Sequence, residues 1–304
     1  MTQTQKDRDA LREWAVFYES GLRRQNSDVN LTQAQIAKDR TRLEADPIEW
    51  IRFFFPEYCK FEFAEFQIKA IRRCIKHEEW FEVLSWARGL AKSTTVMFIV
   101  IYLALTKKKC NVMMASATQD SAVRLLDPYK KQLEENALIR AYYGVQVNLG
   151  NWCAEEFVAK CGCSFRAVGA GNAPRGSRNG AVRPDVLLVD DFDTDEGCRN
   201  PDTIDKNWTW WEKALYGTRD TAVKTLIVFC GNIIARDCCV VRAGHMADHW
   251  DVVNIRDEKG YSTWPSKNTE ESIDIALSKI STAAQQTEYF NNPVTEGEVF
   301  KEST

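Results

Sequence analysis

Two short, unbroken apolar runs constrain the fold of this chain most. They are residues 186–189 (VLLV) and residues 226–229 (LIVF). Continuous apolar runs of this length are typical of strands that are covered on both faces, as in parallel sheets. Similar runs occur at 81–86 and 111–115, and the first of these is followed by an apolar segment, 94–105, that is long enough for a helix. The sequence therefore predicts an α/β fold with an open, twisted, mostly parallel central sheet flanked by helices.

The segments between these runs are predicted from periodicity and turn residues. Residues 120–143 have helical spacing and end at Gly144, a residue type that is common at helix C-termini. Alternation within residues 154–168 predicts a β-hairpin, and residues 169–180 form a polar loop rich in Gly, Asn, Ser and Arg. Strand, helix, strand and helix thus alternate, followed by a hairpin and a loop.

Composition excludes several classes of protein. The chain has 304 residues, of which 44% are hydrophobic and 27% charged, as expected for one sizeable folded domain with appendages. No stretch is long and apolar enough for a membrane span or a signal peptide, so a cytoplasmic location without membrane contact is expected. The ten cysteines lack paired CxxC spacing, which favours reduced thiols over a metal site. A net charge of −3 neither requires nor excludes nucleic acid.

The segment that joins the first expected strand to the following helix has the character of a phosphate-binding loop. Residues 86–93 read WARGLAKS. Backbone N–H groups at such a helix start face an anion, Lys92 is expected to reach the β- and γ-phosphates, and Ser93 to hold Mg²⁺. Trp86 and Ala91 occupy both glycine positions of the standard pattern G-x-x-x-x-G-K-[ST]. Taken alone, the loop is only suggestive.

Two adjacent carboxylates strengthen this interpretation. Asp190 and Asp191 directly follow the apolar run 186–189, and open α/β sheets bind ligands at the carboxyl ends of their strands. Asp190 is expected to coordinate Mg²⁺ through water, and Asp191 to polarise the attacking water. The alternative is that the pair caps the next helix in a loop that is acidic throughout.

Two weaker dipeptides complete an ordered set. Phe66-Gln67 precedes the first expected strand, and Gly231-Asn232 ends the last one. With these motifs in order, the chain resembles the large terminase subunit of tailed bacteriophages, the ATPase of the DNA-packaging motor. Phe66-Gln67 resembles the family's adenine-binding Gln motif, residues 88–93 its deviant Walker A, Asp190-Asp191 its Walker B with the catalytic acid, and Gly231-Asn232 its coupling motif.

The resemblance covers most of the chain and implies a RecA-like P-loop NTPase of the ASCE class that hydrolyses ATP with Mg²⁺. The implied catalytic residues are Lys92, Asp191, Arg88 and Arg175, and the implied metal ligands are Ser93 and Asp190. The implied nucleotide contacts are Phe66, Gln67, Arg88, Gly89, Leu90, Ala91, Lys92, Ser93, Thr94 and Asn232.

The resemblance also interprets individual arginines and departures. Arg88 matches an arginine that is frequent early in this family's Walker A, where a role in stabilising charge is implied. Arg175 looks most like the arginine that reaches the ATP of a neighbouring subunit, with Arg178 and Arg183 as alternatives. Ala91 departs from the usual glycine. Asp191 stands where glutamate is usual, so it must approach the water more closely or act through a second one.

Three segments and several partners follow from the same resemblance. Residues 1–60 are expected to form an N-terminal helical appendage, 61–235 the ATPase core, and 236–304 a lid subdomain that ends where the family's nuclease domain begins. No nuclease activity is expected from this chain. The implied partners are double-stranded DNA, further copies of the chain in a ring, as a pentamer on the motor, the portal protein and the small terminase subunit. The implied location is the host cytoplasm, with transient docking on the procapsid portal.

Two other functions remain open. A superfamily-2 helicase also places a Gln motif before Walker A, but the chain lacks room for a second RecA-like domain and lacks the usual DE-x-[HD] box. A nucleotide-binding scaffold would have the same fold, with Ala91 and Asp191 as signs of a weakened site. The tryptophan-rich run at 208–211 is interpreted as a packed helix face rather than as a platform for stacking on bases.

Overall fold

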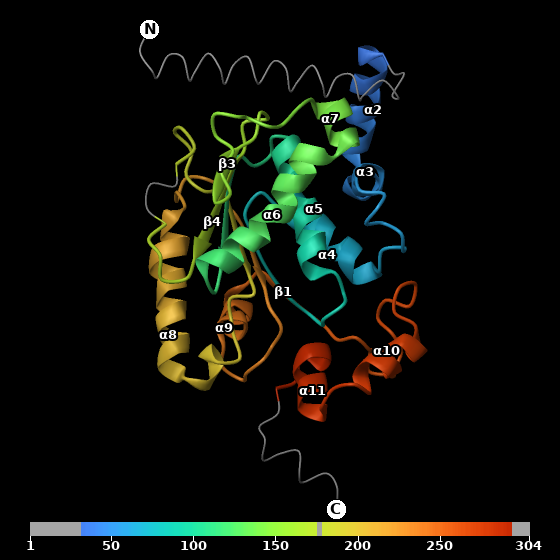
Figure 1. The fold of residues 1–304 in the computed structure, drawn as a ribbon, viewed down its shortest axis with the longest axis vertical. Coiled ribbons are helices and arrows are strands. Elements are labelled where there is room, and N and C mark those ends of the chain that lie inside the picture. Colours follow the sequence, from blue (N-terminus) through green and yellow to red (C-terminus); the bar gives the residue numbers. More distant parts are fainter. Residues whose placement is uncertain (1–31, 175–177, 294–304) are drawn as a thin grey trace, which may run out of the picture.

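A seven-stranded sheet forms the centre of the computed structural model, which describes residues 32–174 and 178–293 (Figure 1). The strand order in this described part is β3-β4-β2-β5-β6-β1-β7. Neighbouring strands are parallel except for the antiparallel pair β3–β4. The strands are β1 (Trp80–Trp86), β2 (Asn111–Ser116), β3 (Glu156–Val158), β4 (Ser164–Gly169), β5 (Val186–Asp190), β6 (Leu226–Cys230) and β7 (His249–Val253). The predicted mixed α/β class with a mostly parallel sheet is confirmed.

Helices cover both faces of this sheet (Figure 1). Those before β3 are α2 (Gln33–Ala45), α3 (Pro47–Phe54), α4 (Glu65–Lys76), α5 (Lys92–Leu105), α6 (Gln119–Glu135) and α7 (Ala137–Tyr143). Those after β5 are α8 (Pro201–Trp210), a π-turn η2 (Trp211–Leu215), a 3₁₀ turn η3 (Tyr216–Thr218), α9 (Cys239–Met246), α10 (Glu270–Leu277) and α11 (Thr282–Phe290). A short 3₁₀ turn, η1 (Gly197–Arg199), precedes α8.

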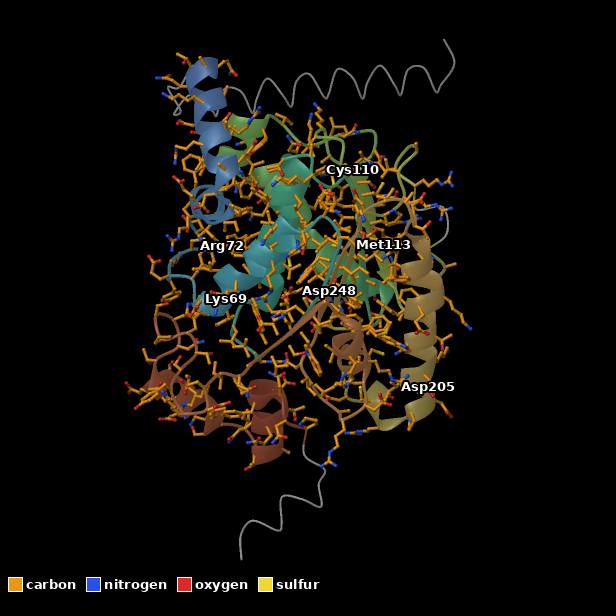
Figure 2. All side chains as sticks on the ribbon, turned by 180° about the vertical axis from the view of Figure 1, so that it is seen from behind. Lys69, Arg72, Cys110, Met113, Asp205 and Asp248 are labelled. Carbon is orange, nitrogen blue, oxygen red and sulfur yellow. The ribbon has the colours of Figure 1, made fainter. Side chains whose placement is uncertain are left out.

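The central strands are buried on both faces, as their continuous apolar runs predict. Every residue of β2, β5 and β6 is buried. Successive residues point to opposite faces, so Val112 and Met114 belong to the hydrophobic cluster under α4, α5 and α6. Met113 belongs to the cluster under α8 and α9, and Figure 2 shows it close to the middle of the molecule.

Helix α5 is buried along nearly its whole length, from Thr95 to Leu105. A helix that is apolar on all sides must be covered on all sides, and aromatic side chains of the N-terminal helices provide part of that cover. Phe55 packs on Phe98 with ring centroids 4.8 Å apart, and Trp50 packs on Tyr102 at 5.2 Å. Helix α3 thus shares the main hydrophobic core, although the sequence placed residues 1–60 in an appendage.

Two details differ from the predicted elements. The helix expected over 120–143 is two helices, because the side chain of Asn136 accepts hydrogen bonds from the N–H groups of Leu138 and Ile139 and starts α7. The sheet continues past residue 235, where the sequence placed the end of the core, because β7 pairs with β1. Strand β7 is only partly buried, so it lacks the apolar run that identified the other strands.

Two other predicted features, the hairpin and the packed tryptophan face, are confirmed. The hairpin of β3 and β4 surrounds Gly162, which has φ 98°. Trp208 and Trp211 stack with ring centroids 4.7 Å apart in the cluster under α8, as expected for a packed helix face. All ten cysteines lie in the described part of the chain and are free thiols. None of the helices in that part is long and apolar enough to cross a membrane.

Candidate functional site

Four predicted site residues meet at the carboxyl edge of the sheet, where β5, β6 and β1 lie side by side. The Nζ of Lys92 donates a hydrogen bond to Oδ1 of Asn232 at 2.9 Å. The hydroxyl of Ser93 donates to Oδ2 of Asp190 at 2.6 Å. Lys92 and Ser93 open α5 after β1, Asp190 ends β5, and Asn232 follows β6. Parallel strands therefore bring these residues together across as many as 140 positions of sequence.

The loop between β1 and α5 has an unusual backbone. Gly89 has φ 86°, and Ala91, the residue that precedes the first turn of α5, has φ 59° in the left-handed region. A residue with a Cβ is disfavoured there by about 1–2 kcal/mol. The left-handed backbone explains why the phosphate-loop pattern has glycine at the position of Ala91. In this chain alanine adopts the left-handed conformation despite its Cβ atom.

Two side chains from distant segments hold the carbonyl groups of this loop. Nζ of Lys267 donates to the oxygen of Gly89 at 2.7 Å, and burial lowers the pKa of this lysine. Nε2 of Gln67 donates to the oxygen of Leu90 at 3.2 Å, while its Oε1 accepts from the N–H of Ala64 at 2.9 Å. Gln67 is thus buried and engaged at both ends of its amide. Its adenine-binding role stays a prediction.

The neighbouring aromatic side chain supports the same loop. Phe66 packs edge-to-face on Trp86, with ring centroids 4.7 Å apart. Trp86 is fully buried, and its indole N–H donates to Asp251 of β7 at 3.2 Å. The large residue at the first glycine position of the phosphate-loop pattern therefore anchors the end of β1.

The two predicted carboxylates have different environments. Asp190 is buried, and this burial raises the pKa of its carboxyl group from 3.8 to about 6, although the charge of Lys92 acts in the opposite direction. Asp191 is exposed and has φ 48°, a left-handed conformation. Asp and Asn tolerate this region far better than longer side chains do. This preference gives a physical reason for aspartate at position 191.

The hydroxyl of Ser93 and the carboxylate of Asp190 fit a magnesium ion. Both are oxygen donors of the kind that Mg²⁺ prefers. Ser93 lies in the first turn of α5 and Asp190 ends β5, and the hydrogen bond between them brings the two side chains together next to the loop. The alternative that the acidic pair caps the next helix is not what the structure shows. The side chain of Asn200 caps α8, the next α-helix, by accepting a hydrogen bond from the N–H of Asp202 at 3.0 Å. Asp193, from the same acidic segment, accepts hydrogen bonds from the N–H groups of Cys239 and Val240 at the start of α9.

Helix α11 contacts the loop directly through Glu288. The main-chain oxygen of Glu288 accepts from the N–H of Arg88 at 2.9 Å and from Nδ2 of Asn232 at 2.9 Å. Its carboxylate pairs with the guanidinium of Arg88 at 2.9 Å, an ion pair in which Arg88 is 69% exposed and which therefore contributes little stability. Glu288 and Lys267 were not identified from the sequence, since no local pattern marks a residue that acts through a contact so distant along the chain.

Several of these residues line a cavity of about 740 Å³, within the range of ligand pockets in proteins: Arg88, Lys92, Ser93, Asp191, Asn232, Lys267 and Glu288. Its described lining joins the loop and α5 to the acidic residues after β5, to Asn232, and to Lys267 and Glu288. A second cavity of about 470 Å³ shares Ser93, Thr94 and Asp191 with it and extends toward Tyr129. The arrangement provides backbone N–H groups, two lysine side chains and several carboxylates around one space, which suits a phosphorylated ligand with a metal ion.

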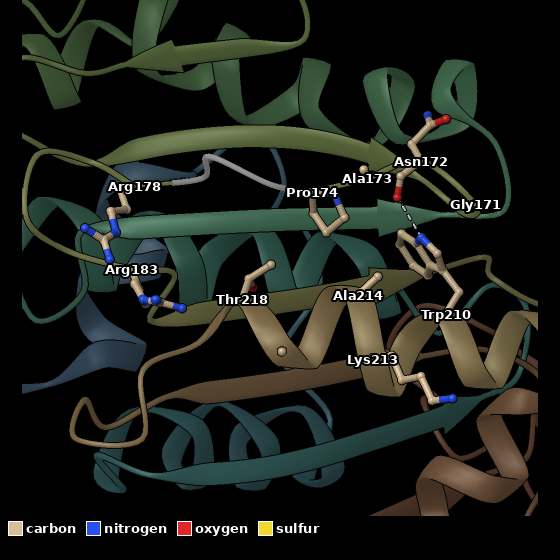
Figure 3. A pocket seen from close by; sticks show the side chains of 11 residues that line it. Gly171, Asn172, Ala173, Pro174, Arg178, Arg183, Trp210, Lys213, Ala214 and Thr218 are labelled. Atoms are coloured by element: carbon tan, nitrogen blue, oxygen red, sulfur yellow. Dashed lines mark hydrogen bonds between the residues drawn. The ribbon is translucent and has the colours of Figure 1, made fainter.

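The predicted arginines that lie among the described residues line two different cavities. Arg88 lies at the cavity just described. Arg175 lies outside the described residues. Arg178 and Arg183 line another cavity (Figure 3). Arg183 precedes β5, at the amino edge of the sheet, whereas Asp190 ends the same strand at the carboxyl edge.

One of three comparisons with known proteins finds a similar fold, the comparison with solved structures. No protein-family model matches the sequence, and neither does any curated protein. Among solved structures, that of the HK97 bacteriophage large terminase is similar, with a TM-score of 0.56 and 12% sequence identity. The match covers 82% of this chain and 55% of that one, so this chain spans about half the length of its structural neighbour. A terminase-like fold, which the sequence resemblance implied, is thereby shown.

Proposed function

We propose that this chain binds and hydrolyses ATP with Mg²⁺, and that hydrolysis drives the movement of double-stranded DNA in viral genome packaging. The observation that carries the proposal is that Lys92, Ser93 and Asn232 line one cavity at the carboxyl edge of a parallel sheet, while Asp190 lies beside it and accepts the hydrogen bond of Ser93. The terminase-like fold supports the same conclusion. The cavity beside Lys92 is proposed to be a P-loop site for ATP.

Nucleotide binding uses groups that are already oriented. The backbone N–H groups at the start of α5 and the helix dipole attract the phosphates. Lys92 exchanges the oxygen of Asn232 for a phosphate oxygen. Ser93 and Asp190 would hold a magnesium ion, which would supply positive charge to neutralise the phosphates.

Hydrolysis is assigned to Asp191 and a water molecule. The water oxygen attacks the γ-phosphorus, the bond from that phosphorus to the β–γ bridging oxygen breaks, and Asp191 accepts the proton of the water, which gives ADP and inorganic phosphate. Arg88 can stabilise the transferred charge only after its guanidinium leaves Glu288. Arg175 of a neighbouring copy is proposed to act on the same phosphate.

Further proposals rest on the terminase-like fold. Double-stranded DNA is the proposed substrate of movement, and further copies of the chain, a portal protein and a small terminase subunit are the proposed partners. Asn232 is proposed to sense loss of the γ-phosphate, because its amide group contacts both Lys92 and the main chain of α11. The segment that contains α10 and α11 would then move relative to the sheet.

The deciding experiment is Lys92→Ala, assayed by phosphate release from MgATP with and without duplex DNA. Turnover is expected to fall on the order of 100-fold or more, because the mutation removes an ammonium group aimed at the transferred phosphate. Lys38→Ala, at an exposed position of α2, is the matched control and is expected to retain wild-type turnover. Unchanged turnover in the Lys92 variant would overturn the proposed function.

A further inference from the structure

A groove of about 600 Å³ runs between residues 171–174, Arg178 and Arg183 on one side and the segment formed by α8, η2 and η3 on the other (Figure 3). Arg178, Arg183 and Lys213 line it, together with Trp210, and its described lining contains no carboxylate. The cavity beside Lys92, by contrast, is lined by several acidic side chains. The two spaces therefore differ in the charge of the ligand that they can accept.

No counter-ion for the three cations of this groove is found among the described residues. None of them forms an ion pair or a side-chain hydrogen bond with another residue in the described part of the chain. Arg73, Arg242 and Arg256, in contrast, each pair with two carboxylates. The whole chain has a net charge of −3, so this local excess of positive charge runs against its average.

Arg183 is the most informative of the three. It is half-buried, and a guanidinium that is partly removed from water without a counter-ion costs free energy that a bound anion would recover. The loop that carries it is held in place by Asn179, whose side chain donates to the oxygens of Cys110 and Gly162 at 3.0 and 2.8 Å. The position of Arg183 in the groove is therefore supported by contacts other than its own.

The arrangement of the charges favours a chain of phosphates over a single one. Figure 3 shows Arg178 and Arg183 at one end of the groove, and Lys213 toward the other end, beside Trp210. Side chains that bind one phosphate must converge on it, whereas these are spread along the groove. The indole N–H of Trp210 donates to the oxygen of Asn172 at 2.7 Å and ties the loop to α8. Both walls of the groove are thus joined before any ligand arrives.

We propose that this groove binds the phosphodiester backbone of duplex DNA, through Arg178 and Arg183 at one end and Lys213 at the other. The inference rests on the proposed function for the identity of the polyanion, and it adds the surface that contacts it. Spaced cations that contact phosphates bind without reading sequence. The groove runs from Arg183, before β5, to Gly171 and Asn172, after β4, and it shares no described lining residue with the cavity beside Lys92.

The test measures binding of a fluorescent DNA duplex by anisotropy, without nucleotide or Mg²⁺, over a range of salt concentrations. The triple variant Arg178→Ala, Arg183→Ala, Lys213→Ala is compared with the wild-type protein. Each lost phosphate contact lowers the slope of log K against log salt by about 0.9, so the triple variant is expected to lose about 2.7. The control triple variant, Lys38→Ala, Lys259→Ala, Lys279→Ala, removes the same charge from exposed lysines elsewhere and is expected to keep the wild-type slope.

The outcomes separate this proposal from the proposed function. A wild-type slope in the groove variant, or an equal loss in both triple variants, would overturn it. A loss seen only with a single strand of the same length would also overturn it. Because no nucleotide is present, failure of ATP hydrolysis cannot alter the result. Should the melting temperature of the triple variant fall, Lys213→Ala alone, at an exposed position, is expected to lower the slope by about 0.9.

Discussion

The ammonium group of Lys92 donates a hydrogen bond to the side-chain oxygen of Asn232, with a nitrogen to oxygen distance of 2.9 Å. This bond joins the first residue of α5 to the segment that follows β6. An ammonium group that already has an acceptor must exchange it when a phosphate arrives. The free energy of nucleotide binding is therefore reduced by the cost of breaking this contact.

The variant Asn232→Ala removes the competing acceptor. ADP is expected to bind several-fold more tightly, because a hydrogen bond to a charged group contributes about 1.5–3 kcal/mol and part of that is recovered. Isothermal titration calorimetry measures the affinity, with Asn151→Ala at an exposed position as the control. Weaker binding in the Asn232 variant would show that Asn232 contacts the nucleotide itself.

Asp191→Asn tests the assignment of the proton acceptor. The amide has the same shape and tolerates φ 48° equally well, but it cannot accept a proton from water. Steady-state hydrolysis is expected to fall by about 10²–10⁴-fold with little change in ADP affinity. Asp191→Glu, the comparison variant, places a longer side chain in a left-handed conformation and is expected to lower the free energy of unfolding by about 1 kcal/mol. Turnover at the wild-type rate in the asparagine variant would remove Asp191 from the mechanism.

Asp190→Asn is expected to make the metal-free protein more stable at neutral pH. Burial raises the pKa of this carboxyl from 3.8 to about 6, so above pH 6 the group is charged in both the folded and the unfolded state, and the full cost of burying the charge is present. As the pH falls from about 6 toward 4, the folded state takes up the proton first, and the disadvantage of the wild-type protein disappears. The difference at pH 7 is at most about 3 kcal/mol, since one pKa unit corresponds to about 1.4 kcal/mol.

Urea unfolding without Mg²⁺ at several pH values between 7.5 and 4.5 checks the Asp190 prediction. The expected pattern is a gap in free energy of unfolding that narrows as the pH falls. A gap that stays constant over this range would contradict it, because a constant gap cannot come from a titrating group.

Ala91→Gly tests the backbone of the loop. Glycine removes the cost of φ 59° at this position, while the greater freedom of glycine in the unfolded chain offsets about 0.5–1 kcal/mol of that gain. The free energy of unfolding of the variant is expected to be equal to that of the wild-type protein or higher by up to about 1 kcal/mol. Ala104→Gly, in the buried part of α5, serves as the contrast and is expected to lose about 1 kcal/mol or more. Equal losses in the two variants would argue against a left-handed Ala91.

The strands were predictable where burial alone determines sequence. Strands β2, β5 and β6 are covered on both faces, so their residues had to be apolar without interruption. Strand β7 lies at the edge of the sheet and carries the polar residues His249 and Asp251, and nothing in its sequence distinguishes it from a loop. The docking of α3 on α5 depends on contacts between distant aromatic residues, which periodicity does not reveal.

The site was predictable where position in the fold follows from strand order. Residues that directly follow parallel strands must meet at one edge, so the approach of Lys92, Ser93, Asp190 and Asn232 could be expected. The contacts of Glu288 could not be expected from the sequence. A glutamate in an amphipathic helix has no signature of its partner, and the partner lies about 200 positions earlier in the chain.

The docking of α11 also has a mechanical consequence. Its residues form hydrogen bonds to the N–H of Arg88, to Asn232, and, through Asn291, to the oxygen of Ser85 and the N–H of Ile233. These hydrogen bonds act in parallel, so a force applied to α11 is shared among them. Each bond contributes about 0.5–1.5 kcal/mol, and all of them must break before the helix separates from the loop. While these hydrogen bonds hold, the helix and the phosphate loop move as one rigid unit. Once enough force is applied to break them, all of the contacts are lost together and the helix separates from the loop.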